Sequence, residues 1–456
     1  MHQTARELRT WFAEHEREIL DDFFALLRFQ SISTDPAFAH AMRQTAAWLC
    51  GMLQKMGGWN VQLWETAGHP VVFATHLKAG PDKPTLLIYN HYDVQPVDPI
   101  ELWRSPPFEP VMRGQEIYAR GASDNKGQCF YNLTALRAFL ALRGGFGCNV
   151  KLLIEGEEEC GSVGSGAAFE AHAEQLKADS LIVLDSSMPA QGVPGMTLGL
   201  RGILSMELSC RTAATDLHSG IHGGIAPNAN RILCSLLSGL WDDAGRVSIP
   251  GFYDDVQDLD AKERALLDFS FDAQAYQEAY GTKGFSMEAG YSALESNWLR
   301  PTLEINGMWG GYTGLGFKTV IPARAFAKLS CRLVPNQSPE HVFARICDAL
   351  RSRVPQGVEL TCQMGEGAAS FRSSAQSQIV QIAKAAMEEV FEKPCRFILH
   401  GASVPITARL SCLSGAQVAL LGVALPGDDI HAPNEHFGWD RFLHGFLMMG
   451  SILDAF

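Results

Sequence analysis

Short polar segments of the chain carry carboxylates and histidines at spacings that could hold metal ions. The densest runs from Ile154 to Ser162 and reads Ile-Glu-Gly-Glu-Glu-Glu-Cys-Gly-Ser, with adjacent glutamates between an apolar run and a glycine-rich bend. Like charges crowded at the end of a buried strand repel one another unless cations neutralise them or solvent screens them. One glutamate could ligate a metal while its neighbour acts as a general base. A solvated acidic loop is the alternative.

A histidine and an aspartate follow a second apolar run. In the segment Leu86 to Asp93, the strand-like residues lead into Asn90, His91, Tyr92 and Asp93. Residues two apart on an extended chain point to one side, so His91 could bind a metal while Asp93 holds its other ring nitrogen. A surface loop that happens to contain both residues is the alternative.

Two more aspartates stand at places where the chain turns. Asp124 lies in a loop between Gly121 and Gly127, where the backbone can approach an ion closely and a carboxylate can bridge two cations with its two oxygens. An Asp-Asn turn before a helix is the alternative. Asp185 ends the apolar run 181–184 and could join the same site or cap a turn or helix.

Alternating strand and helix patterns place these segments in an α/β catalytic domain. We expect an amphipathic helix over 6–29 and helices over 132–143, 166–176 and 379–391. Apolar runs predict buried strands at the ranges 71–75, 85–89, 150–154, 181–184 and 418–422. The pattern predicts a mixed, mostly parallel sheet flanked by helices.

The pattern of apolar and polar residues changes after Gly199. Residues 203–212 alternate between apolar and polar, and 324–334 do so more loosely, which is typical of an antiparallel sheet. The alternation of predicted helices and buried strands resumes at about Ser373. We therefore predict a catalytic domain in two parts, residues 1–198 and 373–456, with an α+β insertion over 199–372.

Composition narrows the class of protein. The chain has 456 residues, too many for one compact core, and a formal net charge of −13, which argues against a nucleic-acid-binding surface or a basic membrane patch. Residues 1–9 lack the layout of a secretory signal, and no apolar run has the roughly 18 residues needed to cross a bilayer. Eleven cysteines without CxxC pairs fit free thiols, so we expect a cytoplasmic enzyme.

Together with His431, these motifs resemble the dinuclear zinc metallopeptidase and amidohydrolase family of carnosinase-like dipeptidases, aminoacylases and glutamate carboxypeptidases. The likeness runs from the His91 region to His431, and the cytosolic nonspecific dipeptidase or carnosinase branch is the most similar. The resemblance implies two divalent ions per subunit, zinc first and manganese or cobalt as alternatives.

The resemblance also assigns roles to individual residues. It implies that His91 and Asp185 bind one ion, that Glu159 and His431 bind the other, and that Asp124 bridges them. Glu158 matches the general base of the family, which takes a proton from the attacking water, and Asp93 matches the partner of the first histidine. The peptide bond after Asp124 would be cis.

The insertion carries further motifs of the same family. Asp216 to Gly220 is similar to its DxHSG segment, whose histidine stabilises the oxyanion in the partner subunit's site, so His218 implies a lid and dimerisation domain and a homodimer. Without the motif, His218 would be an ordinary polar loop residue. In the dipeptidase branch, the residues that match Thr319, Arg332 and Ser403 hold the terminal carboxylate of the substrate.

Three positions depart from the relatives. Asn125 replaces the usual aspartate after the bridging residue, Cys160 replaces a small polar residue, and Ala402 stands where glycine is common. None removes a ligand or the base. Ala402 adjoins the expected carboxylate pocket, so it bears on substrate range. Cys160 is expected to be a packed thiol, because the carboxylate and imidazole ligand set is already complete.

We therefore predict a two-metal hydrolase that cleaves the amide bond of a small carboxylate-bearing substrate, first of all a dipeptide. The alternative on the same scaffold is an N-acyl-amino-acid deacylase, including desuccinylase-like and carbamoyl-amide activities. Other classes are a metal-binding relative without turnover, against which the presence of Glu158 argues, and an interaction protein with an acidic loop, which would bind no stoichiometric metal.

Overall fold

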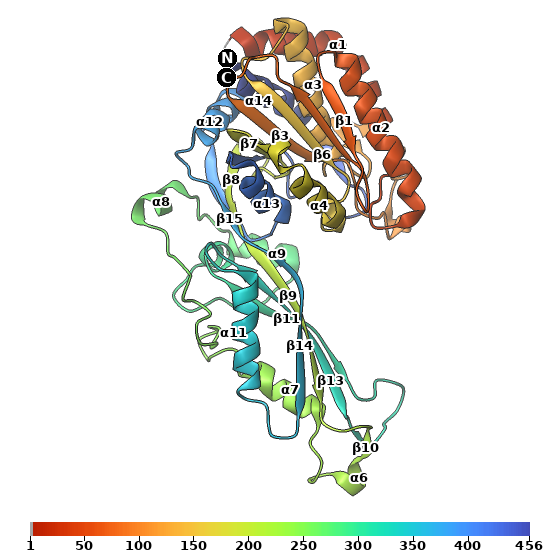
Figure 1. Cartoon of the computed structure of the whole chain (residues 1–456), viewed down its shortest axis with the longest axis vertical. Helices are drawn as coiled ribbons and strands as arrows, with labels where there is room; N and C mark the ends of the chain where they lie inside the picture. The colour runs from red at the N-terminus through yellow and green to blue at the C-terminus, as the bar shows by residue number, and fades with distance from the viewer. Residues whose placement is uncertain (1–2) are drawn as a thin grey trace. The chain divides into compact units, whose positions relative to one another are not determined.

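The computed structural model describes residues 3–456, which fold into two compact units (Figure 1). The first unit comprises Met1–Leu198, Ser373–Ile398 and Arg409–Phe456. The second comprises Gly199–Arg372 and Leu399–Ala408. The chain therefore leaves the first unit after Leu198 and returns at Ser373, and it enters the second unit once more over Leu399–Ala408.

A mixed sheet forms the centre of the first unit. Its strands follow the order β1-β2-β6-β3-β7-β17-β8-β15, and β16 also pairs with β8. The pairs β6–β3, β3–β7 and β7–β17 are parallel, whereas β1–β2, β2–β6, β17–β8 and β8–β15 are antiparallel. The strands are β1 (Asn60–Trp64), β2 (Val71–His76), β3 (Thr85–His91), β6 (Asn149–Glu155), β7 (Ser180–Leu184), β8 (Gly195–Leu200), β15 (Phe371–Arg372), β16 (Arg396–His400) and β17 (Gln417–Leu421).

Helices flank this sheet (Figure 1). Helices α1, α3 and α14 pack on one another through stacked and tilted aromatic rings that include Phe23, Phe130 and Phe442. The apolar stripe of α1 is buried, as its periodicity predicts. The helices are α1 (Gln3–Leu27), α2 (Ala39–Met56), α3 (Lys126–Arg143), α4 (Val163–Ala171), α5 (Ala173–Leu176), α12 (Gln378–Phe391), α13 (Pro405–Ser414) and α14 (Trp439–Asp454).

Two expected helices differ in extent from the structure. Helix α3 begins at Lys126, six residues before the predicted start, because its first two turns are buried on every side and show no amphipathic period. The segment expected to be one helix over 166–176 is two, α4 and α5, which are separated at His172. Both differences lie beside loops that carry site residues.

Short elements complete the first unit. A small antiparallel sheet has the order β18-β5-β4, with β4 (Val111–Arg113), β5 (Glu116–Tyr118) and β18 (His436–Gly438). Strand β18 fixes the chain just after the loop that contains His431. The one-turn helices are η1 (Pro36–Phe38), η2 (Ile100–Leu102) and η3 (Glu158–Cys160).

The second unit is α+β, as predicted, with an antiparallel sheet in the order β11-β13-β9-β14. Burial alternates along β9, and its inner face packs with α7 and α11 in one apolar core. The elements are β9 (Gly202–Arg211), β10 (Leu217–His218), α6 (Ser219–His222), α7 (Ala229–Ser238), α8 (Ala261–Leu266), α9 (Ala273–Tyr280), α10 (Ala293–Trp298), β11 (Thr302–Gly310), β12 (Val320–Ile321), β13 (Arg324–Leu333), α11 (Pro339–Arg351) and β14 (Glu359–Ala368).

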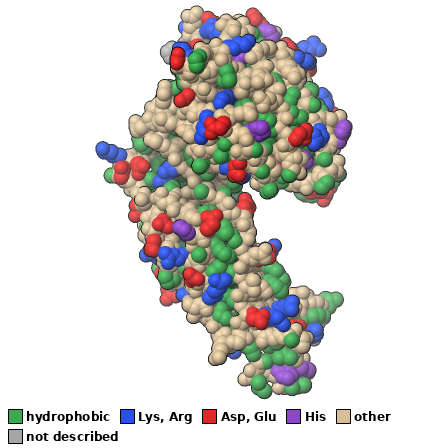
Figure 2. Space-filling view, in the orientation of Figure 1, with side chains coloured by type: hydrophobic (Ala, Val, Ile, Leu, Met, Phe, Trp, Pro, Cys, Tyr) green, Lys and Arg blue, Asp and Glu red, His purple; other side chains and the backbone are tan. Residues whose placement is uncertain are grey.

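No helix within residues 3–456 has the length and the apolar character required to span a lipid bilayer. On the face drawn in Figure 2, acidic and basic side chains are interspersed over both units.

Candidate metal centre

Loops at one edge of the first unit's sheet carry the predicted metal ligands. His91 is the last residue of β3, Asp185 follows β7, and η3 follows β6 after a two-residue turn. Because β6, β3 and β7 are parallel neighbours, their carboxyl ends lie at the same edge. Asp124 comes from the loop before α3, and His431 from the loop between β17 and β18.

Six side chains form two ligand groups. His91, Glu158 and Asp185 make one group, and Asp124, Glu159 and His431 make the other, with the ligand atoms of each group within 4.8 Å of one another. Asp124 joins the groups: its Oδ1 is 3.2 Å from His91 Nε2 and its Oδ2 is 3.0 Å from His431 Nε2. The structure thus brings together the five predicted ligands and the predicted base.

Asp93 positions residues of both ligand groups. Its carboxylate lies 3.3 Å from His91 Nδ1, so Nε2 is the nitrogen that faces Asp124. The same carboxylate accepts the backbone N–H groups of Glu158 at 3.2 Å and Glu159 at 3.0 Å. One buried side chain therefore orients a histidine and the turn that carries both glutamates.

Glu435 organises the loop of Asp124 and was not among the predicted residues. Its carboxylate accepts the N–H groups of Ser123 and Asp124, both at 2.9 Å, and forms an ion pair of 2.8 Å with Arg120. The peptide bond between Asp124 and Asn125 is cis, as the resemblance implies. A lone glutamate four residues after His431 carries no local signal of this role.

Asn125 acts as a donor to the first ligand group. Its Nδ2 lies 3.0 Å from Asp185 Oδ1 and 2.6 Å from the backbone oxygen of Leu184, and Asn90 donates to its Oδ1 at 2.9 Å. An ionised aspartate at this position could not donate, so the amide of Asn125 has a defined function here. In the second ligand group, Glu159 has a donor of its own, because Gln95 Nε2 donates to Glu159 Oε2 at 2.8 Å.

The electrostatics of the cluster suit divalent cations. Burial raises the pKa of Glu158 well above its usual value and that of Glu159 to about 7. Hydrogen bonds to Asp124 and Glu159 raise the pKa of His431 to about 10. Glu159 Oε1 is buried and has no hydrogen-bond partner among residues 3–456. Carboxylates crowded in this way are stabilised by bound cations, and a carboxylate–imidazole set accepts zinc, manganese or cobalt. The residues fit the two ions that the resemblance implies.

His218 and Thr319 lie together in the second unit. Strands β10 and β12 pair His218 with Val320, and Ser219 donates its N–H to the backbone oxygen of Thr319 at 3.0 Å. His218 Nδ1 accepts the N–H of Gly220 at 3.0 Å. Neutral His218 must therefore carry its proton on Nε2, which is the form that can donate to an oxyanion.

Arg332 and Ser403 form a second predicted pair in the same unit. Arg332 Nη1 donates to Ser403 Oγ at 2.7 Å, although the two residues are 71 positions apart. Both belong to the second unit, because Leu399–Ala408 is part of it. Thr319, the third expected carboxylate contact, has its described contact with the His218 segment instead.

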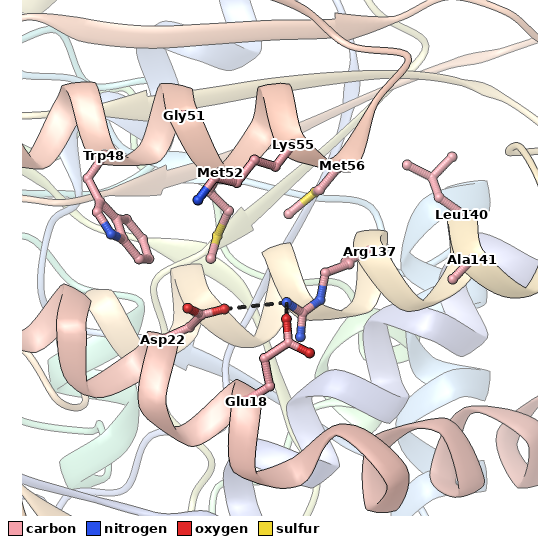
Figure 3. Close-up of a pocket in the computed structure, with 10 residues that line it drawn as sticks. All are labelled: Glu18, Asp22, Trp48, Gly51, Met52, Lys55, Met56, Arg137, Leu140 and Ala141. Carbon is pink, nitrogen blue, oxygen red and sulfur yellow. Dashed lines mark hydrogen bonds and ion pairs between the residues drawn. The ribbon is translucent and has the colours of Figure 1, made fainter.

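A pocket of about 570 Å³ between α1, α2 and α3 contains none of these residues (Figure 3). Arg137 lies at its floor and contacts Glu18 at 3.2 Å and Asp22 at 3.4 Å. Trp48 and Met52 face them from α2, as Figure 3 shows. With Lys55, the lining carries two acidic and two basic side chains, so the pocket has no net formal charge.

The family relationship rests on similarity along most of the chain. Residues 87–455 match Peptidase family M20/M25/M40. The chain belongs to this family. It is 31% identical over 376 residues to the Cys-Gly metallodipeptidase dug1 of Schizosaccharomyces pombe, which covers 80% of this chain and 78% of that protein.

Further members of the M20 family extend the comparison. The chain is 30% identical to the human Beta-Ala-His dipeptidase, with 82% of this chain and 75% of that protein covered. The crystal structure of the M20 metallo-carboxypeptidase Sso-CP2 from Sulfolobus solfataricus superimposes with a TM-score of 0.84 at 35% identity and covers 96% of this chain and 98% of that one. The chain is therefore a metal-dependent hydrolase of the M20 family.

Proposed function

We propose that this M20 hydrolase is a dipeptidase that uses two divalent metal ions. The observation that carries the proposal is the pair of ligand groups joined by Asp124, one of which contains Glu158, in a chain whose relatives are named dipeptidases. Small peptides with a free terminal carboxylate are the proposed substrates.

Each residue at the centre has a proposed task. His91 and Asp185 hold one ion, Glu159 and His431 hold the other, and Asp124 contacts both. When bound, the ions would acidify a water molecule and polarise the scissile carbonyl. Zinc is the proposed metal, with manganese or cobalt as alternatives.

Glu158 is the proposed general base. It takes a proton from the attacking water and returns it to the leaving amine. Its burial supports this role, because a carboxylate with a raised pKa holds a proton at neutral pH more readily than an exposed one. Asp93 keeps Glu158 in place through its backbone N–H.

Arg332 and Ser403 are proposed to hold the terminal carboxylate of the substrate. A guanidinium offers two parallel donors to a carboxylate, and the hydroxyl of Ser403 lies beside it. This assignment supports a substrate with a free carboxyl end, as in a dipeptide or an N-acyl amino acid.

We also propose a homodimer in which His218 acts in the partner's site. Large apolar side chains near His218 are exposed to solvent, and Figure 2 shows hydrophobic and histidine side chains gathered around α6. Such a set supports contact with a second copy. The exposed residues are Ile221, Ile225, Leu315 and Phe317. Thr319 would reach the partner together with His218, because Ser219, the residue after His218, donates its N–H to the backbone oxygen of Thr319 at 3.0 Å.

The cytoplasm is the proposed location. All eleven cysteines are free in the structure, and several are buried in the cores of the two units. A reducing compartment preserves such thiols.

The alternative activity is deacylation of N-acyl amino acids, including desuccinylase-like or carbamoyl-amide hydrolysis. It uses the same chemistry, so substrates must separate the two. Amino-acid release should be measured from free dipeptides and from N-acyl amino acids with metal-loaded protein. We expect free dipeptides to be cleaved, and cleavage of acylated substrates alone would establish the deacylase instead.

Glu158→Gln is the decisive variant in this assay. We expect its kcat to fall by about 10²–10⁴-fold while two metal ions per chain remain bound. Glu174→Gln is the matched control, because Glu174 is exposed on α5 and should leave kcat unchanged. An equal rate for the two variants would remove Glu158 from the mechanism, and no turnover on either substrate set would favour a binding role.

A further inference from the structure

A second cavity lies within the inserted unit and has a polar floor and an apolar wall. Its volume is about 690 Å³, and all of its lining residues belong to the second unit. Arg332, the proposed carboxylate contact, is part of the lining.

The floor of the cavity is one face of the antiparallel sheet. Strands β11 and β13 pair Thr302 with Arg332 and Glu304 with Ser330, and residues that face each other across a pair lie on one side of the sheet. The intervening Leu303 belongs to the buried core of the unit. The strand alternation therefore separates a polar cavity floor from the apolar core.

Two guanidiniums face this cavity, and within residues 3–456 neither forms an ion pair, although the charge of Glu304 on the same lining acts on Arg201. In the described part of the chain, Arg201 donates to the backbone oxygens of Gly401 at 2.8 Å and Arg300 at 3.4 Å, and Arg332 donates to Ser403. All of these acceptors are uncharged. Burial and the nearby charge of Arg332 lower the pKa of Arg201 to about 10. A carboxylate in the cavity would compensate both charges.

Another part of the lining is aromatic and aliphatic. Phe271, Tyr276 and Phe285 form a cluster with ring centroids 5.4–5.9 Å apart, and each remains 37–40% exposed. Met287 and Leu294 extend the lining. Exposed aromatic rings beside a cavity favour the binding of an apolar group, because contact with it removes apolar surface from water.

From these observations we infer that the cavity is the subsite for the carboxy-terminal residue of the substrate, and that it selects a large apolar or aromatic side chain. The carboxylate binds Arg332, with Arg201 as the second positive charge, and the side chain packs against the rings. Glu304 on the floor disfavours an acidic side chain. The inference rests on the proposed function, because it requires a substrate with a free carboxyl end.

Dipeptide kinetics test the selection directly. The values of kcat/KM should be compared for Ala-Phe, Ala-Leu, Ala-Gly and Ala-Glu. We expect Ala-Phe and Ala-Leu to exceed Ala-Gly by at least about tenfold, and Phe285→Ala to reduce the Ala-Phe to Ala-Gly ratio about tenfold, which is the order of magnitude of one aromatic contact with its buried area. Tyr280→Ala is the control, because Tyr280 lies on the same aromatic segment outside the lining.

Two kinetic results would overturn the inference. One is a preference for Ala-Glu over Ala-Phe, which would make the paired guanidiniums a site for an acidic side chain. The other is an Ala-Phe to Ala-Gly ratio that Phe285→Ala and Tyr280→Ala change equally.

A binding measurement separates this inference from the proposed function. L-phenylalanine and glycine should be titrated into the full-length Glu158→Gln protein by calorimetry. We expect tighter binding of phenylalanine by about tenfold, and loss of the difference in the Phe285→Ala double variant. Equal affinities would refute the subsite even if dipeptides are cleaved. Absence of dipeptide cleavage would refute only the function if the binding difference persists.

Discussion

At the scale of single residues, the centre depends on side chains that bind no metal themselves. Asp93 contacts His91 through its carboxylate and accepts the N–H groups of Glu158 and Glu159. Because a carboxylate partner fixes the ring and raises its basicity, its loss weakens metal binding without removing a ligand.

We expect Asp93→Asn to lower metal affinity by about 10–100-fold. The asparagine keeps one acceptor oxygen but loses the charge and the second acceptor. Competition with a chelator of known affinity measures the change. Asp82→Asn, on an exposed loop, is the control. Unchanged affinity in Asp93→Asn would mean that backbone contacts alone position His91.

Glu155 gives the protein a dependence of stability on pH. Burial raises the pKa of Glu155 to about 8, from about 4.5 for an exposed glutamate. The folded state therefore binds the proton more tightly than the unfolded state does. Its contribution to the free energy of unfolding is full below about pH 4.5 and declines as the pH rises towards 8.

We expect Glu155→Gln to remove this decline. Chemical denaturation of the metal-free protein at pH 5 and pH 8 should show that the variant gains stability relative to the wild type at the higher pH. The amide keeps an oxygen for the hydroxyl of Ser162, which donates to Glu155 at 2.5 Å. Parallel pH curves for the two proteins would show that Glu155 titrates normally.

At the scale of elements, the start of α3 sets the position of the Asp124 loop. A Cβ at Gly127 would lie 2.0 Å from the backbone oxygen of Ala122, so the helix and the loop touch through their backbones. This close approach requires glycine, and it explains why the helix can begin immediately after the ligand loop.

Gly127→Ala should therefore destabilise the fold by about 1–3 kcal/mol and reduce metal content. Thermal unfolding and metal analysis measure the two effects. Gly145→Ala is the matched control just after the other end of α3, since a Cβ there meets nothing within 4 Å. Equal behaviour of the two variants would show that the loop moves aside without cost.

At the scale of the whole molecule, the proposed dimer places catalytic groups from two chains in one site. Glu158 lies in the first unit and His218 in the second. If His218 acts in the partner's site, two inactive chains can complement each other, because a mixed dimer contains one site with both groups intact.

Co-expression of Glu158→Gln and His218→Ala chains should restore about a quarter of the wild-type activity. Random pairing makes about half of the dimers mixed, and one of their two sites is complete. Activity of the purified mixture measures the recovery, and light scattering measures the mass. A mixture no more active than the separate variants would place His218 in the site of its own chain or outside catalysis.

The sequence by itself determined the fold class and most of the residues of the candidate metal centre. Asp93 stands two residues from His91, and Glu158 beside Glu159, so local spacing and the end of an apolar strand were enough to predict that these side chains face one edge of a sheet. Strands with uniform apolar runs and helices with a clear apolar period can also be predicted, because both patterns are local in the sequence. The start of α3 was not predicted, because a helix buried on every side has no period.

Only the tertiary structure decided which distant segments support these residues. Glu435 holds a loop 311 residues earlier in the chain, and Arg332 meets Ser403 across 71 residues. The cavity with Phe285 and Arg201 also joins segments that no motif connects. Contacts of this kind arise when strands pair and cores pack, so spacing along the chain carries no record of them.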